Sequence, residues 1–125
     1  MPFTLRYLPS ENILLVRGFG GGDVHEGHRV VMAIQAHQEY HAGIPVLLDI
    51  RELAYVPSLA DARELASLYA TALHQSRVAV LAPPGVAFTG AINVERLADA
   101  RGARMVAFIT REEAMRWLTS QPTEQ

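Results

Sequence analysis

The chain of 125 residues contains no cysteine, which excludes a disulfide framework and a thiol nucleophile. No apolar run approaches the roughly 18 residues that a membrane-spanning helix needs. The net charge is only −2 and no run of like charges exceeds two residues, so we expect no basic surface for nucleic acid. The first residues also lack the basic-then-apolar order of a secretion signal. Together these absences predict a soluble, cytoplasmic protein that does not span a membrane.

The composition is that of an ordinary globular domain. Half of the residues are apolar and 19% are charged, a balance that disordered chains do not have. A chain of this length forms one domain with a single sizeable core. We therefore expect one domain over residues 1–120, followed by a polar tail at 121–125.

The order of the apolar segments predicts the fold class. Two strand-like runs, 3–8 and 12–18, lie close together and are joined by a turn-rich segment. After them, helical and strand-like segments alternate: helix, strand, helix, strand, helix, strand, helix. Alternation of this kind implies a mainly parallel sheet with right-handed crossovers, and the initial hairpin adds one antiparallel strand at an edge. We expect an α/β domain with a five-stranded mixed sheet and four helices.

Capping residues and helix breakers predict where the elements begin and end. Asp23, Ser58 and Thr110 are suited to cap three of the helices, and Gly102 is suited to end the remaining one. The expected strands after the hairpin are 46–50, 77–82 and 104–109. The first helix is expected to run from Asp23 toward His41, where Gly43 stops it, and the third to span 90–101. The expected buried face of the second helix comprises Leu59, Ala62, Leu65, Ala66, Tyr69 and Leu73.

This order of elements resembles the STAS domain, named for sulfate transporters and anti-sigma-factor antagonists. The segment Val46–Ile50 is similar to the family's third strand, and Leu53–Leu59 lies where the family has a strand-to-helix loop. The closing Arg111–Leu118 is similar to the ending of a bacterial stand-alone branch of these domains. The resemblance covers nearly the whole chain and implies a non-catalytic regulatory or protein-interaction module.

The resemblance also points to Ser58. In regulatory members a phosphorylatable Ser or Thr follows an Asp in this loop, and the next helix docks on a partner kinase. Ser58 occupies the matching position, but Pro57 replaces the acidic residue, and Leu59 and Ala60 replace the hydroxyl residue and glycine that follow. A phosphate on Ser58 would be stabilised at a helix N-terminus. The alternative is that Ser58 only caps the helix.

A glycine cluster is a second candidate site. Gly18, Gly20, Gly21 and Gly22 follow a strand and precede a helix, which is the setting in which backbone N–H groups hold a phosphate. Asp23 stands where a dinucleotide fingerprint has its third glycine, and its carboxylate would repel a pyrophosphate. The alternative is a connection whose helix Asp23 already caps.

Four histidines fall on the expected first helix. His25 and His28 are three residues apart and His37 and His41 are four apart, spacings at which two side chains can share a metal. The two pairs would point in different directions and neither has a third ligand nearby. We therefore expect no bound metal and no cofactor.

Two further candidates lie at loops. Asp49 is expected at the carboxyl end of the third strand, where open α/β sheets place ligands, although pairing with an arginine is the alternative. The segment 83–90, which includes Phe88, looks apolar and irregular. Together with Tyr55 and Val56 it could form a hydrophobic patch, unless Phe88 folds back onto the core.

The leading functional hypothesis is an interaction module that acts through Tyr55, Val56, Ser58 and Leu59 on a protein partner or on a second copy of itself. The second is a carrier or sensor of a small apolar or anionic ligand. Its expected residues are Asp49, Tyr55, Phe88 and the glycines Gly20, Gly21 and Gly22. An enzyme is the least favoured class, because no nucleophile, paired acid or catalytic motif is visible.

Overall fold

The computed structural model describes residues 3–120, so the polar tail expected at 121–125 lies outside the described residues. The elements follow one another in the expected order, β-β-α-β-α-β-α-β-α. The strands are β1 (Phe3–Leu8), β2 (Ile13–Gly20), β3 (Val46–Leu53), β4 (Arg77–Leu81) and β5 (Arg104–Phe108). The helices are α1 (Val24–Ala36), α2 (Leu59–Ala72), α3 (Val86–Asp99) and α4 (Arg111–Thr119).

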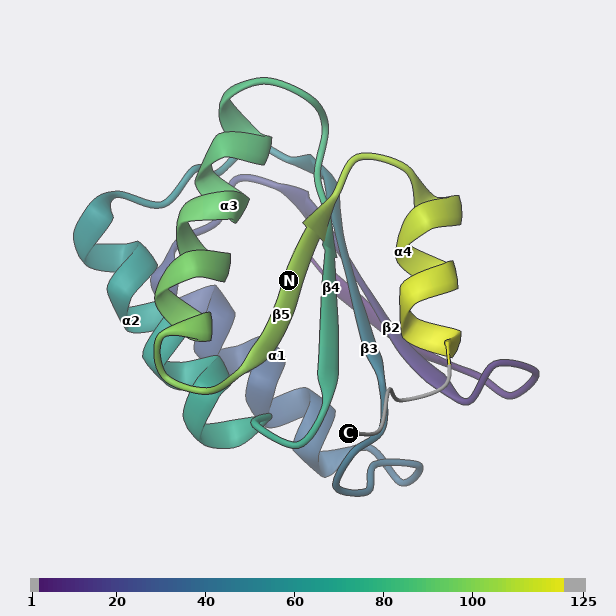
Figure 1. Ribbon diagram of the computed structural model, residues 1–125. Helices are drawn as coiled ribbons and strands as arrows, with labels where there is room; N and C mark the ends of the chain where they lie inside the picture. The colour runs from purple at the N-terminus through teal and green to yellow at the C-terminus, as the bar shows by residue number, and fades with distance from the viewer. Residues whose placement is uncertain (1–2, 121–125) are drawn as a thin grey trace.

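The five strands form one mixed sheet in the order β1-β2-β3-β4-β5 (Figure 1). β1 pairs with β2 in antiparallel orientation at one edge, and the other three pairings are parallel. The predicted fold class and the edge position of the antiparallel strand are therefore confirmed. Four consecutive residues of β2, Ile13–Val16, are buried, as a strand covered on both faces requires.

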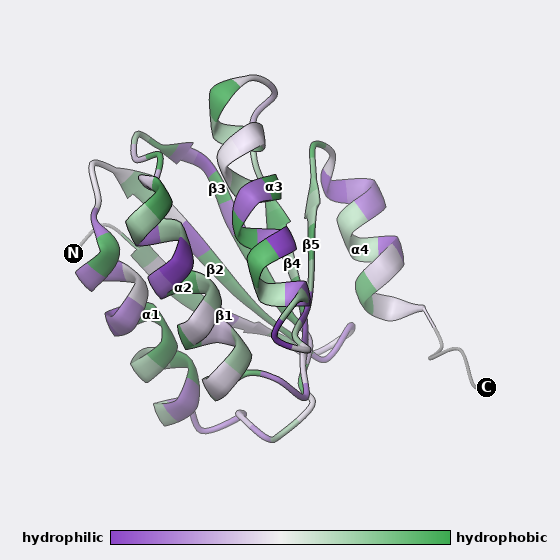
Figure 2. Ribbon diagram, turned by 60° about the vertical axis from the view of Figure 1, so that its left-hand side comes forward, coloured by the Kyte–Doolittle hydropathy of each residue, from purple (hydrophilic) through white to green (hydrophobic). Residues whose placement is uncertain are grey.

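The helices divide unequally between the two faces of the sheet. α1, α2 and α3 cover one face and α4 covers the other (Figure 1). Along α1 and α2, hydrophobic and hydrophilic residues alternate with the helical turn, so that each helix has an apolar side for the sheet (Figure 2). The larger hydrophobic cluster lies under α1–α3, and the smaller one, built on Ile13, Leu15 and Leu47, lies under α4.

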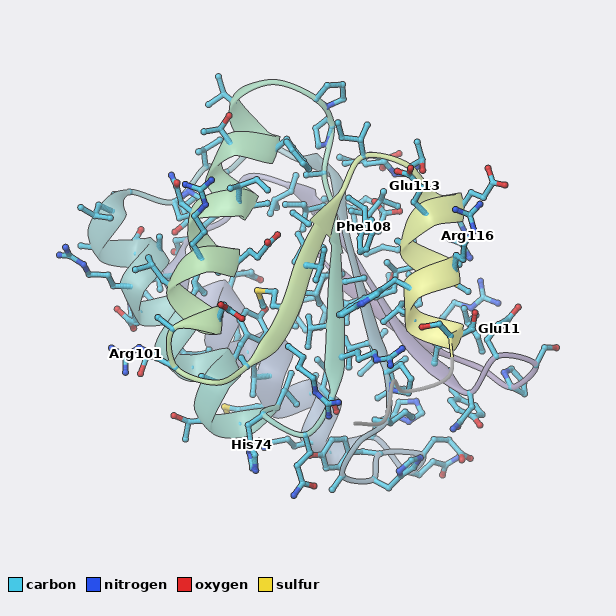
Figure 3. All side chains as sticks on the ribbon, viewed as in Figure 1. Glu11, His74, Arg101, Phe108, Glu113 and Arg116 are labelled. Carbon is cyan, nitrogen blue, oxygen red and sulfur yellow. The ribbon has the colours of Figure 1, made fainter. Side chains whose placement is uncertain are left out.

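Residues from the sheet hold α4 in place. Phe108 of β5 lies between the sheet and α4, whereas Glu113 and Arg116 lie on the outer side of the helix (Figure 3). The Phe108 and Trp117 rings are 5.8 Å apart. Arg77 at the start of β4 donates from Nη1 to the carbonyl oxygen of Trp117 at 2.7 Å, and the Ser120 hydroxyl group donates to the same oxygen at 2.9 Å, so the end of the helix is bonded to the sheet.

The three predicted side-chain caps are all present. Asp23, Ser58 and Thr110 each accept a hydrogen bond from the backbone N–H three residues later, at 3.0, 3.1 and 3.3 Å. Gly102 has φ +89°, the left-handed conformation expected of a helix stop. These short-range signals predicted the starts of α1, α2 and α4.

The expected extent of the first helix was wrong. α1 ends at Ala36, and His37 is its C-cap with an extended backbone (φ −69°, ψ 139°). The His37 Nδ1 atom accepts from the Glu39 N–H at 3.0 Å, which stabilises the turn that replaces the last helical turns. Consequently His25 and His28 lie on α1, whereas His37 and His41 lie beyond it.

The expected start of the third helix was also wrong. α3 begins at Val86 rather than at Gly90, so residues 86–90 of the segment 83–90, which was expected to be irregular, are helical. Gly85 has φ +103°, and its carbonyl oxygen accepts from the Thr89 N–H at 3.0 Å. The helix therefore starts directly after the Pro83-Pro84-Gly85 turn, without a side-chain cap.

Smaller differences concern strand ends and one core residue. β2 and β3 continue to Gly20 and Leu53, so both are longer than expected. Leu59, expected to be buried, is 59% exposed because it is the first residue of α2 and lies beyond the edge of the packed face. Ala62, Ala66, Tyr69 and Leu73 are buried as predicted, whereas Leu65 is only partly buried.

α1 and α2 approach each other closely at Gly27. A Cβ atom at this position would overlap Leu65 Cδ2, so the glycine leaves room for the present position of the Leu65 side chain. Nearby, His28 Nε2 and Glu64 Oε2 lie 2.8 Å apart and connect the two helices. No helix among the described residues is long and apolar enough to cross a membrane.

Candidate ligand-binding cavity

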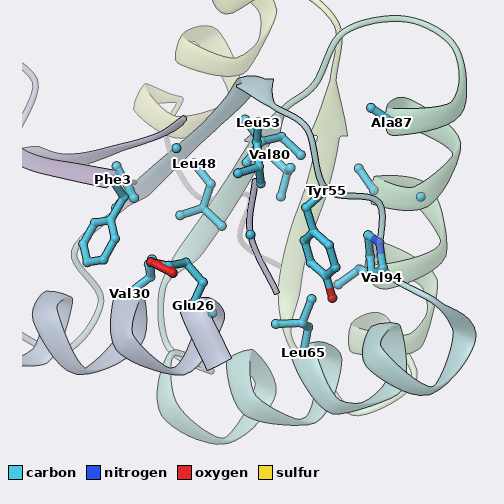
Figure 4. Close-up of a pocket in the computed structure, with 18 of the residues that line it drawn as sticks. Phe3, Glu26, Val30, Leu48, Leu53, Tyr55, Leu65, Val80, Ala87 and Val94 are labelled. Atoms are coloured by element: carbon cyan, nitrogen blue, oxygen red, sulfur yellow. The ribbon is translucent and has the colours of Figure 1, made fainter. Parts of the chain in front are cut away.

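A cavity of about 130 Å³ lies between the sheet and the three helices α1–α3 (Figure 4). It is on the carboxyl half of β2, β3 and β4, the region where open α/β sheets place ligands. Residues from all three helices and from every strand take part in its wall. The lining residues are Phe3, Val16, Gly18, Gly22, Asp23, Glu26, Gly27, Val30, Leu48, Ile50, Leu53, Tyr55, Pro57, Leu65, Tyr69, Val80, Ala87, Gly90, Ala91, Val94 and Met105.

The cavity exists because small residues stand where large ones would fill it. Four glycines and two alanines lie in its wall, three of them, Ala87, Gly90 and Ala91, on adjacent turns of α3. At Gly90 an added Cβ would come within 3.1 Å of Val56 Cγ1, so the loop before α2 packs directly on α3. The remaining wall is mostly aliphatic and aromatic, which favours an apolar occupant.

Among the described residues, Asp23 and Glu26 are the only charged residues that line the cavity. Both come from the start of α1. The Asp23 carboxylate already accepts from the Glu26 N–H at 3.0 Å and therefore serves as the helix cap. Its negative charge also opposes an anion at this helix end, where the free N–H groups would otherwise favour one.

The Glu26 carboxylate is only half satisfied. Its side chain is 12% exposed, and Oε1 accepts from Arg29 Nη2 at 2.8 Å. Its other oxygen, Oε2, is buried and has no hydrogen-bond partner among the described residues. Figure 4 shows the Glu26 side chain at the same end of the cavity as Phe3 and Val30. Buried polar atoms without a partner are uncommon in folded proteins.

Tyr55 forms another part of the wall, close to Leu65 and Val94 (Figure 4). Its hydroxyl group donates to Asp61 Oδ2 at 2.7 Å, which fixes the ring over α2. Burial, and then the hydrogen bond to the Asp61 carboxylate, raise the pKa of Tyr55 well above its ordinary value. The tyrosine therefore stays neutral and contributes mainly an apolar ring surface to the cavity.

Asp49 lies on the opposite face of the sheet from the cavity. Its neighbours Leu48 and Ile50 line the cavity, and alternation along β3 turns Asp49 toward the α4 side, as it does Leu47. The carboxylate accepts from Arg51 Nε at 3.0 Å and from Arg51 Nη2 at 2.9 Å. Burial acts to raise the pKa of Asp49, but the hydrogen bonds from Arg51 outweigh it and hold the pKa below its usual value.

The predicted ligand residues are thus divided between different places. Tyr55 and Gly22 line the cavity, whereas Asp49 lies on the other face of the sheet, where it pairs with Arg17 and Arg51. Gly20 ends β2 and Gly21 follows it, and a Cβ atom added to either would meet nothing within 4 Å. Phe88 packs against the larger hydrophobic cluster and does not line the cavity.

The predicted partner loop is exposed at the surface beside the cavity. Val56 is 44% exposed and Leu59 is 59% exposed, and Ser58 between them caps α2. Tyr55, at the beginning of this loop, turns into the cavity wall. One short segment therefore contributes both to the cavity and to an exposed apolar surface.

The histidines do not form a metal site. Within residues 3–120, no three His, Cys, Asp or Glu side chains gather closely enough to hold a metal ion. His28 is engaged with Glu64, and the His41 ring lies 3.2 Å from the carbonyl oxygen of Ala42.

Glu26 is not predicted as a lining residue from the sequence, because a glutamate three residues after the cap Asp23 also fits the second position of a capping box. A second signal was available. Glu26 precedes the buried Val30 by one helical turn, so it shares the helix side that faces the sheet. A carboxylate on an apolar helix face predicts a buried or paired charge.

Two of the solved structures that match this chain illustrate the shared architecture. One is an uncharacterized protein of the DUF3478 family with a SpoIIAA-like fold, from Shewanella loihica. It is 16% identical, and the alignment covers 93% of this chain and 91% of that one with a TM-score of 0.60. The other is the anti-sigma factor antagonist SpoIIAA in its unphosphorylated form, 18% identical, with 92% and 94% covered and a TM-score of 0.57.

No protein-family model and no curated protein sequence matches the chain. The structural likeness nevertheless establishes the fold. The chain has the SpoIIAA-like fold of five strands and four helices, which is the fold that the resemblance to STAS domains implied.

Proposed function

We propose that this protein is a non-catalytic sensor or carrier that binds a small apolar molecule in the cavity between the sheet and α1–α3. The observation that supports this most directly is the cavity itself, about 130 Å³ in volume and lined mainly by apolar side chains. An engineered apolar cavity of about 150 Å³ stays dry and binds benzene, so this volume suits a molecule with a single aromatic ring.

The chemistry of the cavity wall supports binding rather than catalysis. The Asp23 carboxylate is occupied as a helix cap, and the Tyr55 hydroxyl group donates to Asp61. Glu26 has one free carboxylate oxygen but no nucleophile beside it among the described lining residues. This arrangement lacks the pair of nucleophile and base that covalent catalysis needs.

Toluene is a suitable first probe. Titrated into the methyl-labelled protein, it is expected to shift the NMR signals of Val30, Leu53 and Leu65, which line the cavity. The methyl groups of Leu47 and Leu118 lie in the smaller cluster on the other face and should stay unshifted. Uniform small shifts at all of these methyl groups, or none at any concentration, would refute the proposed binding site.

The second candidate function is docking of a protein partner, which the exposed apolar residues Val56 and Leu59 favour. They flank Ser58 at the start of α2, the element that the family resemblance associates with partner binding. A phosphate on Ser58 would place negative charge beside this surface. Self-association through this surface would give a homodimer. A cytoplasmic location would suit both ligand binding and partner docking.

We expect Leu59→Arg to abolish whatever association this surface makes, because a charged side chain in an apolar contact is costly to desolvate. Sedimentation velocity tests self-association, and affinity capture from native lysate tests other partners. Met32→Arg is the matched control, since Met32 is 68% exposed on α1, away from this loop. Association that survives Leu59→Arg, or that Met32→Arg also removes, would argue against the docking surface.

A further inference from the structure

We infer that the natural ligand of the cavity is a small, mostly apolar molecule that carries one primary amine, and that this amine donates a hydrogen bond to Glu26 Oε2. The inference rests on the proposed function, because it concerns the head group of the molecule that the cavity binds. The evidence for it is the unpaired Glu26 oxygen, the acidic charge of the cavity wall and the hydrogen bond that already engages the Tyr55 hydroxyl group.

The unpaired oxygen of Glu26 marks a position where a hydrogen-bond donor is missing. Glu26 Oε2 is buried and without a partner among residues 3–120, whereas Oε1 of the same carboxylate is bonded to Arg29 at 2.8 Å. A carboxylate can accept about four hydrogen bonds in all. The Arg29 guanidinium does not line the cavity, so it does not occupy the space that a ligand would fill. Because Oε2 is buried, the amine would reach it after the Glu26 side chain turns toward the cavity.

The charge of the wall determines the sign of the head group. The two charged residues that line the described cavity, Asp23 and Glu26, are both acidic. In a largely apolar space these carboxylates attract a cation and repel an anion more strongly than they would in water. An ammonium group meets this requirement, and a carboxylate or phosphate head group does not.

The hydroxyl groups of the two tyrosines at the wall, Tyr55 and Tyr69, offer no charge that competes for the head group, because burial raises the pKa of both and keeps them neutral. The Tyr55 hydroxyl group donates its proton to Asp61 at 2.7 Å and lies toward Leu65, whereas Glu26 lies at the Phe3 end of the cavity (Figure 4). The ligand would therefore place its amine near Glu26 and its apolar body between Phe3, Leu48 and Tyr55. A single polar contact in an apolar cavity fixes the orientation of the ligand.

The test compares four probes of similar shape: benzylamine, benzyl alcohol, toluene and benzoate. Near neutral pH, where benzylamine is protonated, we expect it to bind the wild-type protein about tenfold more tightly than toluene, because hydrogen bonds to charged groups are the stronger ones. Benzyl alcohol should fall between the two, and benzoate should not bind. Methyl NMR titration measures all four affinities at the same lining residues.

The variant Glu26→Gln keeps the size of the side chain and removes its charge. We expect the tenfold preference for benzylamine to disappear while the toluene affinity stays within about twofold. The control is Glu64→Gln, which removes a carboxylate from α2 that does not line the cavity, and it should keep the preference. If thermal melting shows that Glu26→Gln does not fold, the four wild-type affinities still decide.

The outcomes separate the two proposals. If toluene binds but benzylamine binds no better, or if Glu64→Gln lowers the preference as much as Glu26→Gln does, the amine inference is wrong and the apolar cavity function remains. If neither probe shifts the lining methyl groups, both proposals are overturned. Benzylamine binding that depends on Glu26, with benzoate excluded, supports both.

Discussion

The variant Ala91→Leu is expected to abolish toluene binding while leaving the protein folded. Ala91 is 6% exposed on α3 and lines the cavity, so three added carbon atoms would occupy the space that the ligand needs. The added side chain gains apolar contacts in the cavity, but strain from an imperfect fit offsets part of that gain. We therefore expect the free energy of unfolding to change by no more than about 1 kcal/mol. NMR titration with toluene and urea denaturation measure the two quantities.

Ala36→Leu is the matched control for this substitution. Ala36 is the last residue of α1, exposed and outside the cavity wall, so the variant should bind toluene like the wild-type protein. If Ala91→Leu proves too bulky to fold, Ala87→Leu at the start of α3 fills the same space from a half-buried position. Toluene binding that is unchanged in a folded Ala91→Leu protein would place the site elsewhere.

Arg51→Met is expected to destabilise the protein by about 2 kcal/mol near neutral pH, since removing one partner leaves a buried charge uncompensated. Asp49 is 5% exposed and takes three hydrogen bonds from Arg51, two from its side chain and one from its backbone. Methionine keeps much of the apolar stem and removes the side-chain donors. In the variant, Arg17 Nε would still lie 4.0 Å from Asp49 Oδ2 and keep part of the electrostatic attraction. The Arg51 side chain is also partly exposed, so the loss of stability stays below that of a fully buried pair.

The sign of the pH dependence follows from the pKa of Asp49. Because the folded-state pKa lies below the ordinary value, the pair contributes stability above the unfolded pKa, about 4, and loses it as the pH falls through the folded pKa. The difference between wild type and Arg51→Met should therefore be largest near neutral pH and shrink in strong acid. Urea unfolding at several pH values measures it.

Arg116→Met provides the comparison for Arg51→Met. Arg116 and Glu112 form an exposed pair one turn apart on α4, 3.4 Å between Nη2 and Oε2, and its loss should cost less than about 0.5 kcal/mol. Equal losses in the two variants, or a loss for Arg51→Met that does not vary with pH, would show that the Asp49 pair is not the cause.

Local signals predicted the fold because they act over a few residues. The N-caps Asp23, Ser58 and Thr110 and the stop at Gly102 depend only on neighbouring backbone groups, and all four are present. The start of α3 depends on more than local preference. A glycine such as Gly90 predicts a helix boundary, but Gly90 is buried within α3, where Val56 of the loop before α2 packs against it.

The cavity could not be predicted, because a run of apolar residues in a sequence indicates a core and not a space within it. Its wall combines Phe3, Glu26, Tyr55 and Ala91, which are brought together by the sheet and three helices. Tyr55 was predicted as a site residue from its place after β3, and it does line the cavity. Asp49 lies within β3, and its side chain is on the opposite face of the sheet from the cavity because side chains alternate along a strand.

The unequal helix coverage bears on how the chain folds during synthesis. Strand order equals chain order, so each strand can join the sheet as it leaves the ribosome. Among the described elements, however, α4 alone covers the face that carries Ile13, Leu15, Leu47, Ala79 and Leu81. A nascent or truncated chain that stops before Thr110 would leave this face open to water. Such chains should aggregate or recruit chaperones, although their sheet is already complete.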